Sequence, residues 1–397
     1  MTISPVSLSL GAAPGKLSSN IQTVVQLALE QQRLVGAVIL VARDGELLYQ
    51  QAAGWADRES CRAMTVDTIF RLASVSKPIT STAALVLVAQ GHLDLDDSID
   101  RWLPEFRPGL PDGRPAQITV RQLLSHTAGL GYRFFEPDME GPYVRAGVSD
   151  GMDATGISLE ENLRRIGSVP LLYQPGTAWG YSLATDVLGA LIERVQGVPL
   201  NVAVSELVTF PLGLKDTDFF VHEAQRVATA YTNGTPQPHR LKEGEVVPAF
   251  EDTIGICYSP SRIFDRQAFP SGGAGMAATA GDFLHLLETL RQGGGNLLPS
   301  ALIAEMERDQ TQGYALPAAP GFGFGLGFSV LRDRELAMSP ESDGTWRWGG
   351  AYGHSWFVDR AQGLSVVAFT NTLYEGMSGR FVTDLRDAVY SALEVRL

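Results

Sequence analysis

The chain has 397 residues, of which 45% are apolar, a composition typical of a soluble globular protein with one large domain or two to three ordinary ones. Its 44 acidic and 31 basic residues give a net charge of −13, which argues against nucleic acid as a partner because that affinity rests on neutralising phosphates. No apolar run approaches the ~20 residues needed to cross a bilayer, so no membrane partner is expected.

The predicted elements begin with an amphipathic helix over about residues 17 to 33, where apolar residues recur with helical spacing. Two strand-like segments follow, 36 to 42 and 47 to 54. Asp44-Gly45 between them favours a left-handed turn, so the pair is predicted to form a β-hairpin.

The middle of the chain, about 83 to 255, carries helical patterns separated by turns that contain proline and glycine. The clearest helix is Leu183 to Val195, which Gly197 ends. Strands return near the C-terminal end, and a last amphipathic helix follows them. The predicted strands are 345 to 348, 354 to 359 and 364 to 371, and the last helix places Phe381, Leu385, Ala388, Val389 and Ala392 on one face.

Strands at both ends with helices between them predict an α/β protein of the α+β type. We expect an antiparallel sheet built from the N- and C-terminal segments and flanked by helices. The predicted unit covers 17–392. Within it, 1–82 and 256–397 form an α/β region, and 83–255 forms an inserted, mainly helical region.

The segment GFGFGLGF, residues 321 to 328, is rich in glycine but lacks the GxGxxG spacing of a phosphate-binding loop. Its phenylalanines alternate with other residues. This alternation predicts a strand that packs with one face on the core.

Cysteine and histidine usage argues against metal chemistry. Cys61 and Cys257 lie far apart without a CxxC pattern, so we expect two ordinary buried thiols rather than a disulfide framework or a zinc site. The six histidines are at least 17 residues apart, so none forms an HExxH-type pair. Neither a metal nor another cofactor is expected.

The N-terminal stretch, residues 1 to 17, has no basic residue before Lys16 and no compact apolar core. No secretory signal is therefore predicted, and a cytoplasmic location is expected.

Residues 74 to 77 read Ser-Val-Ser-Lys at the start of a helix that Gly91 ends. Residues three apart on a helical turn share one face, so the Lys77 amine reaches the Ser74 hydroxyl. Burial and the helix N-terminus both favour a neutral amine, which can accept the serine proton. Only four of the 31 basic residues are lysines, Lys16, Lys77, Lys215 and Lys242, and arginine could not serve as this base.

Two other interpretations compete with this one. Ser74 or Ser76 could simply cap the helix while Lys77 extends to water, and Pro78 favours that interpretation because the residue before proline avoids the helical region. A nucleophile elbow is the second, but the stretch from Gly180 to Ala184 lacks the final glycine of G-x-S-x-G.

Two further stretches favour the catalytic interpretation. Trp179-Gly180-Tyr181 follows a Pro-Gly turn and opens a helix, which would place the Tyr181 hydroxyl at a junction between regions. Trp348-Gly349-Gly350-Ala351 lies on a late strand, where paired glycines allow close approach to the backbone.

With these motifs in this order, the chain resembles the serine beta-lactamase and penicillin-binding-protein superfamily, specifically the class C-like branch that contains the family VIII carboxylesterases. The likeness covers roughly residues 17 to 392. LLSHTAGL at 123 to 130, FPLGLKDT at 210 to 217 and SGGAGMAATAGDF at 271 to 283 are similar to further landmarks of the family.

The resemblance implies a beta-lactamase-like fold and a role for each motif. Ser74 would be the acylated nucleophile, Lys77 its base, and Tyr181 the group that protonates the leaving group and later activates water. The backbone amides of Ser74 and Ala351 would form the oxyanion hole.

The departures from the family pattern indicate the substrate. Leu183 stands where class C-like members have the asparagine of Y-x-N, and Trp348 with Gly349 and Gly350 stands where the family has K-T-G. Losing the lysine disfavours anionic substrates and favours neutral ones. An apolar substrate pocket is expected, lined by Trp348, Gly349 and Gly350 together with Tyr132, Phe134, Phe135 and Trp179.

We therefore expect a cytoplasmic serine carboxylesterase whose partner is a small, neutral, short-chain ester. A beta-lactamase, a D-aminopeptidase or another amide hydrolase with the same nucleophile is the alternative, and an acyltransferase is a close variant. A non-catalytic binding protein would need to have lost one of Ser74, Lys77 or Tyr181, and all three are present. His126 and His354 are expected to be structural.

Overall fold

The computed structural model of the chain describes residues 9–10, 15–317 and 319–393. Most of the stretch from 1 to 17, on which the absence of a secretory signal is predicted, lies outside the described residues, so the cytoplasmic location stays a prediction. Across the described ranges no single helix is long and apolar enough to cross a membrane. One pair, Ala184–Gln196 with Leu200–Leu212, passes that test together but is bent by 81°.

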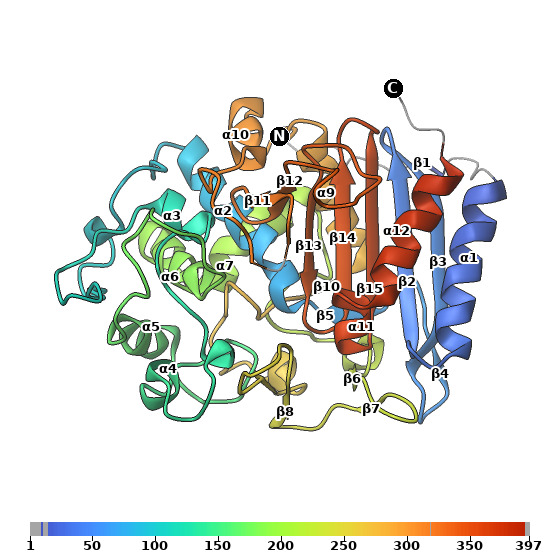
Figure 1. The fold of residues 1–397 in the computed structure, drawn as a ribbon, viewed down its shortest axis with the longest axis horizontal. Helices are drawn as coiled ribbons and strands as arrows, with labels where there is room; N and C mark the ends of the chain where they lie inside the picture. Colours follow the sequence, from blue (N-terminus) through green and yellow to red (C-terminus); the bar gives the residue numbers. More distant parts are fainter. Residues whose placement is uncertain (1–8, 11–14, 318, 394–397) are drawn as a thin grey trace.

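A nine-stranded sheet fills one half of the molecule and is built from both ends of the chain (Figure 1). Its order is β1-β3-β2-β15-β14-β13-β12-β11, with β4 paired to β3, and its pairs are antiparallel except β1 with β3. The expected antiparallel sheet of N- and C-terminal segments is therefore confirmed. The strands are β1 (Ser9–Leu10), β2 (Gly36–Arg43), β3 (Glu46–Asp57), β4 (Arg62–Ala63), β11 (Phe322–Phe324), β12 (Ser329–Leu331), β13 (Trp346–Gly350), β14 (His354–Asp359) and β15 (Leu364–Thr370).

The β2–β3 hairpin turns where the sequence predicts it. Asp44 and Gly45 both have positive φ, 54° and 86°, which is the left-handed pair that a tight hairpin turn requires. Strand β2 is apolar up to Ala42 because both of its faces are buried there: alternate residues such as Ile39 face one apolar cluster, and their neighbours such as Leu40 face another.

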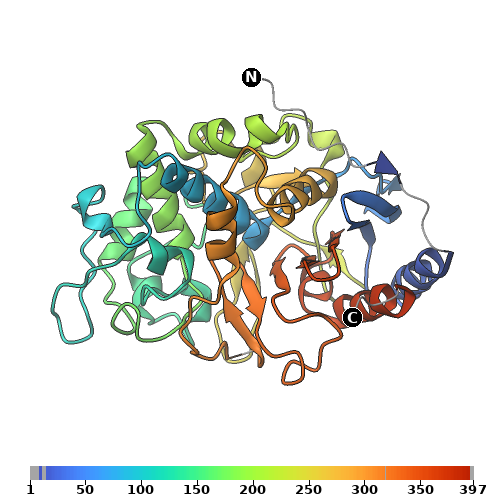
Figure 2. The same cartoon turned by 90° about the horizontal axis from the view of Figure 1, so that it is seen from above.

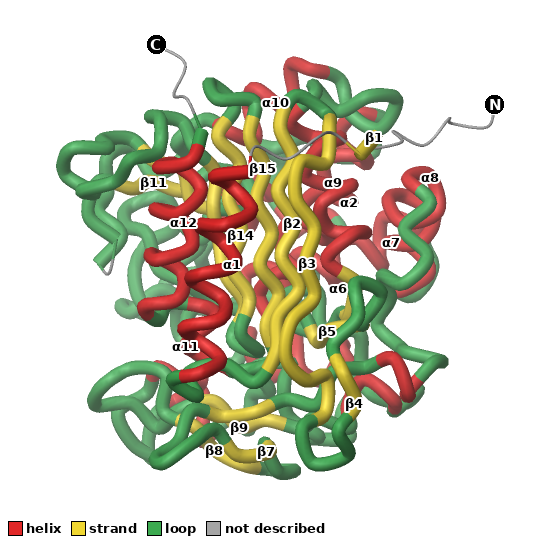
Figure 3. Tube along the Cα trace, turned by 90° about the vertical axis from the view of Figure 1, so that its right-hand side faces the viewer, coloured by secondary structure: helices red, strands yellow, loops and turns green. Residues whose placement is uncertain are grey.

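Helices cover both faces of this sheet (Figure 3). Helices α1 and α12 pack against each other and share one apolar cluster with β2 and β15, while α9 packs on the opposite face. The helices are α1 (Gly15–Glu30), α2 (Ser76–Ala89), α3 (Val120–Leu124), α4 (Pro142–Arg145), α5 (Leu159–Gly167), α6 (Ala184–Gln196), α7 (Leu200–Val204), α8 (Phe210–Leu212), α9 (Ala280–Arg291), α10 (Ser300–Glu307), α11 (Leu373–Met377) and α12 (Arg380–Ala392).

Helix α2 lies between the sheet and a mainly helical half that holds α3 to α7 (Figures 1 and 2). It packs against α6 and α7, and α6 ends at Gly197, whose φ is 71°. The proposed divisions after residues 82 and 255 stay predictions. Short two-stranded ladders complete the fold: β5 (Ile69–Arg71) with β10 (Ala277–Thr279), β6 (Tyr231–Thr232) with β7 (His239–Arg240), and β8 (Glu245–Val247) with β9 (Ile256–Tyr258).

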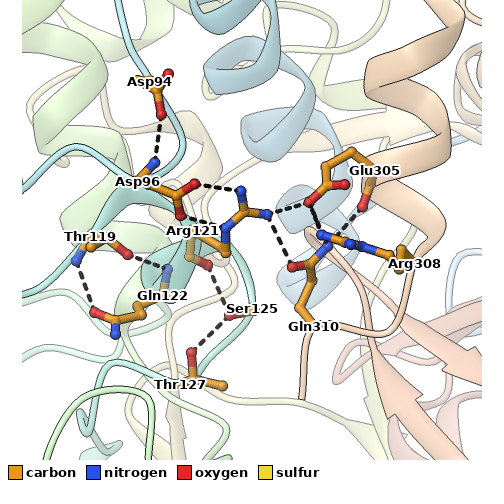
Figure 4. A network of polar contacts seen from close by, with 10 residues as sticks. All are labelled: Asp94, Asp96, Thr119, Arg121, Gln122, Ser125, Thr127, Glu305, Arg308 and Gln310. Atoms are coloured by element: carbon orange, nitrogen blue, oxygen red, sulfur yellow. Dashed lines mark hydrogen bonds and ion pairs between the residues drawn. The ribbon is translucent and has the colours of Figure 1, made fainter. Parts of the chain in front are cut away.

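An arginine-centred network ties the helical half to the segment leading into β11 (Figure 4). Arg121 on α3 forms a two-pronged ion pair with Asp96, at 2.7 and 2.9 Å. It also contacts Glu305 on α10 and donates to Gln310 at 3.1 Å. One guanidinium therefore joins three separate segments.

Two sequence expectations are wrong in detail. The segment from Gly321 to Phe328 is not one strand: β11 ends at Phe324, Gly327 turns with φ of 109°, and Phe328 packs in a different cluster from Phe324. Cys61 is an exposed free thiol on a turn with φ of 54°, and Cys257, also free, is half-buried.

Candidate active site

The Ser74 hydroxyl and the Lys77 amine are brought together by a change of helix type. Ser74 lies in a 3₁₀ turn, Ala73–Val75, that leads directly into α2. Residues three apart nearly eclipse in such a turn, and Lys77 Nζ lies 3.2 Å from Ser74 Oγ. Ala73 enters the turn with φ of 45°, a conformation that costs energy for alanine and marks a constrained backbone.

The capping interpretation does not fit this geometry. The Ser76 hydroxyl accepts from the Met276 backbone N–H at 3.2 Å. Lys77 is fully buried rather than extended to water. Ser74 is partly exposed, so an incoming molecule can reach its hydroxyl.

A glycine-rich segment approaches the other side of the Lys77 amine. Nζ donates to the Gly273 carbonyl at 2.9 Å, and one turn later the Thr80 hydroxyl donates to Gly272 at 2.7 Å. A Cβ on Gly272 would lie 2.7 Å from the Thr185 carbonyl, so only glycine fits this approach. The segment 271 to 283 therefore positions the Lys77 amine through a backbone carbonyl.

Tyr181 meets the same serine from the segment just before α6. Its hydroxyl lies 2.6 Å from Ser74 Oγ, and Lys77 Nζ lies 4.7 Å from the centre of its ring. The Gly180 N–H donates to the His126 carbonyl at 2.9 Å, which fixes the backbone beside Tyr181. Two side chains from distant segments, Lys77 and Tyr181, thus converge on the Ser74 hydroxyl.

The end of β13 packs directly on the 3₁₀ turn. A Cβ on Gly350 would lie 2.3 Å from the Leu72 carbonyl and 3.0 Å from Val75 Cγ2, so the two backbones touch. Ala351, the next residue in the chain, is buried. Ser74 and Ala351 therefore lie on segments in direct contact, as two backbone donors to one oxyanion would need to.

His354 and Tyr258 stabilise this contact. His354 Nε2 lies 2.7 Å from the Arg71 carbonyl, and burial lowers the pKa of His354 to about 4, so the ring is neutral and donates this bond. The Tyr258 hydroxyl donates to the Ala351 carbonyl at 3.3 Å. His354 acts here as a structural link between β14 and the end of β5, which leads into the turn.

Aromatic rings surround Tyr181. The ring centres of Trp348 and Tyr132 lie 5.1 and 5.2 Å from that of Tyr181. Phe134 stacks on Tyr132 at 4.5 Å, and Phe135 lies 6.5 Å from Tyr181. The structure therefore brings these expected substrate-binding residues together.

Trp179 is connected to this group of rings through Phe324. It packs on Phe324 at 5.6 Å, and Phe324 in turn meets Trp348 at 5.1 Å. Sequence reasoning missed Phe324 as a member of this group, although it singled out its segment. It also missed Phe250, which is exposed and whose ring lies 5.0 Å from Phe135.

His126 packs against Tyr181, with ring centres 4.9 Å apart. Its Nδ1 lies 3.2 Å from the Ser182 hydroxyl. Burial, and next the positive charge of Lys77, hold the pKa of His126 well below its usual value, so the ring is neutral. Among the described residues, no group of three or more His, Cys, Asp or Glu side chains is arranged to hold a metal ion.

Comparison with known proteins gives a consistent picture. The beta-lactamase family model matches residues 21–391. Esterase EstB of Burkholderia gladioli is 50% identical over 391 residues, which cover 98% of this chain and 99% of EstB. Monacolin J acid methylbutanoyltransferase of Aspergillus terreus is 28% identical over 387 residues, covering 88% and 89% of the two chains. The solved structure titled "EstCE1, a hydrolase with promiscuous acyltransferase activity" superposes with a TM-score of 0.93 at 46% identity, covering 94% of this chain and 98% of that one.

Proposed function

This chain belongs to the beta-lactamase family, and from that premise we propose that it is a serine carboxylesterase of the family VIII type that hydrolyses neutral, short-chain esters through an acyl-enzyme on Ser74. One observation carries the proposal: Ser74 Oγ lies 2.6 Å from the Tyr181 hydroxyl and 3.2 Å from the Lys77 amine. The 50% identity to Esterase EstB over nearly the whole chain supports the ester as the bond that is cleaved.

In the proposed acylation, Ser74 Oγ bonds to the ester carbonyl carbon while its proton passes to the Lys77–Tyr181 pair. The carbonyl oxygen becomes an oxyanion, stabilised by the backbone amides of Ser74 and Ala351. The bond to the alcohol oxygen then breaks, and Tyr181 supplies that oxygen with the proton. The products of this half-reaction are a free alcohol and an ester on Ser74.

Deacylation repeats these steps with water. Water adds to the acyl carbon and gives its proton to the Lys77–Tyr181 pair, and the second oxyanion forms between the same two amides. When the bond to Ser74 Oγ breaks, the serine recovers its proton and the carboxylic acid leaves.

The groups around this centre support a neutral substrate. Trp348 stands beside Tyr181 where a K-T-G lysine would supply a cation. Leu183 is fully buried in the core, so the Y-x-N position offers no amide to a lactam side chain. The aromatic rings of Tyr132, Phe134 and Phe135 offer apolar contacts to an acyl or alcohol group.

The test is a comparison of substrates. We expect p-nitrophenyl acetate and butyrate to be hydrolysed, with Ser74→Ala lowering kcat/KM by at least about 10³-fold. A chromogenic cephalosporin should react far more slowly, with opening of the lactam measured separately from loss of its acetyl ester. Full ester turnover by Ser74→Ala would contradict the mechanism, and a cephalosporin rate above the ester rate would favour the amide-hydrolase alternative.

Acyl transfer is the second candidate, because the names of EstCE1 and of the methylbutanoyltransferase describe that reaction for those proteins. Here an alcohol would take the place of water in deacylation. Addition of a primary alcohol to the p-nitrophenyl butyrate assay should then yield the new ester. If butyrate is the sole acyl product, the protein hydrolyses the ester and does not transfer the acyl group.

A further inference from the structure

Asp186 is a buried carboxyl group that the proposed mechanism does not use. It is the third residue of α6, five positions after Tyr181, and only 1% of it is exposed. Its Oδ1 accepts from the Ser271 hydroxyl at 2.6 Å. Its Oδ2 is buried and makes no side-chain hydrogen bond among the described residues, and the backbone N–H of Gly273 is the polar group that favours its charge.

The Oδ2 atom faces the Lys77 amine across a glycine. A Cβ placed on Gly273 would lie 2.5 Å from Asp186 Oδ2 and 3.5 Å from Lys77 Nζ. The two atoms are therefore at most about 6 Å apart, the sum of those distances. Because Gly273 has no side chain, only its backbone lies between the carboxyl and the amine, and a larger residue would place a side chain there.

The other groups facing this amine carry no formal charge in their ordinary state. Ser74 and Tyr181 are the reacting partners, and the Tyr132 ring centre lies 5.6 Å from Nζ. Burial, and next the Tyr181 hydroxyl, raise the pKa of Tyr132 well above its usual value. His126, behind Tyr181, is neutral as described above.

Asp186 also interacts electrostatically with Arg262, a partly buried guanidinium that donates to the Asp153 carbonyl at 2.7 Å and the Phe269 carbonyl at 2.6 Å. Burial raises the pKa of Asp186, while the Ser271 hydrogen bond and the charge of Lys77 oppose that rise. Ser271 thus holds Asp186 nearer to its ionised form.

We propose that Asp186 is a positioning residue that provides the counter-charge to Lys77 and so sets the pH at which the Lys77–Tyr181 pair can accept the serine proton. The inference rests on the proposed esterase function. An ionised carboxylate within about 6 Å favours the protonated amine. The Lys77–Tyr181 pair is then a stronger base, but it loses its proton and becomes active only at higher pH. Removing the charge has the opposite effect on both properties.

The test is the pH profile of kcat/KM for p-nitrophenyl butyrate with Asp186→Asn. For charges no more than about 6 Å apart, Coulomb's law predicts a shift of the acidic limb to lower pH by at least about 0.5 unit in a water-like medium and at least about 2 units at an effective dielectric of 20. Ser271→Ala keeps the carboxyl but removes its hydrogen bond, so we expect a smaller shift in the same direction.

Asp282→Asn is the matched control, because it removes a half-buried carboxyl on α9 that accepts from the Thr217 hydroxyl and the Asp216 N–H and from no group of the site. Its acidic limb should stay at the wild-type pH. If Asp186→Asn does not fold, the Ser271→Ala shift decides. If every folded variant keeps the acidic limb of its kcat/KM profile at the wild-type pH and only its maximal kcat/KM falls, the proposal is overturned. If the wild-type protein shows no ester turnover, the proposed function is overturned instead.

Discussion

Gly350→Ala tests whether the contact between β13 and the 3₁₀ turn aligns the oxyanion donors. The added methyl group would lie 2.3 Å from the Leu72 carbonyl and 3.0 Å from Val75 Cγ2. Ordinary contacts begin near 3.4 Å, so the two segments must separate by about 1 Å. The Leu72 carbonyl is backbone and cannot rotate away as a flexible side chain would.

A misplacement of about 1 Å near reacting groups costs on the order of 10² in rate, and loss of one oxyanion donor costs 10² to 10³. We therefore expect kcat for p-nitrophenyl butyrate to fall about 100-fold. KM should change less, because Tyr132, Phe134 and Phe135 contribute apolar contacts from a segment outside β13. Overpacking should also lower the free energy of unfolding by about 1 to 3 kcal/mol.

Gly281→Ala is the control, because the nearest atom to its Cβ, Thr279 Oγ1, would be 3.8 Å away. Both variants are assayed for kcat, KM and thermal unfolding at one temperature where each is folded. A folded Gly350→Ala with wild-type kcat would refute the reasoning, as would an equal loss of kcat in the control.

Three further predictions concern charge. Trp348→Lys restores the cation of K-T-G, so the ratio of kcat/KM for anionic over neutral esters should rise about tenfold; an unchanged ratio would contradict the assigned pocket. Burial raises the pKa of Asp150 to about 8. The folded state thus holds more protons than the unfolded state between about pH 4 and 8, and stability falls as pH rises. Urea unfolding should lose on the order of 4 kcal/mol from pH 5 to 8 in the wild type but not in Asp150→Asn. Arg121→Met removes the guanidinium of Figure 4 and should cost about 1 to 2 kcal/mol of unfolding free energy at low salt; equal stability at low and high salt in both proteins would contradict it.

Local chemistry made much of the fold predictable. The hairpin follows from Asp44-Gly45, because few other residues accept the left-handed pair that the turn adopts. The spacing of Ser74 and Lys77 predicted their contact because a helical turn fixes the distance between residues three apart.

Contacts between distant segments were not predictable from spacing. Asp186 and Phe250 carry no local signal, and their neighbours Gly273 and Phe135 are more than 80 residues away in the chain. The family resemblance supplied Tyr181 by matching a motif, but no motif marked Asp186. Such residues became visible only when burial and distance were known.

Two errors have the same physical origin. Alternating phenylalanines at 321 to 328 fit a strand, but Gly327 allowed a turn that sent Phe328 into another cluster. Cysteine is usually buried, yet Cys61 occupies a turn with positive φ whose side chain points to solvent. In both cases backbone conformation overrode the preference of the side chain.

The identity of the acylated residue tests the central claim most directly. The wild-type protein is treated with an alkyl p-nitrophenyl phosphonate, digested, and mapped by mass spectrometry, with Ser74→Ala treated in parallel. We expect one phosphonyl group on the peptide that carries Ser74, appearing as ester hydrolysis is lost, and no adduct in the variant. Loss of activity with the adduct on another residue, or equal labelling of Ser74→Ala, would contradict the account.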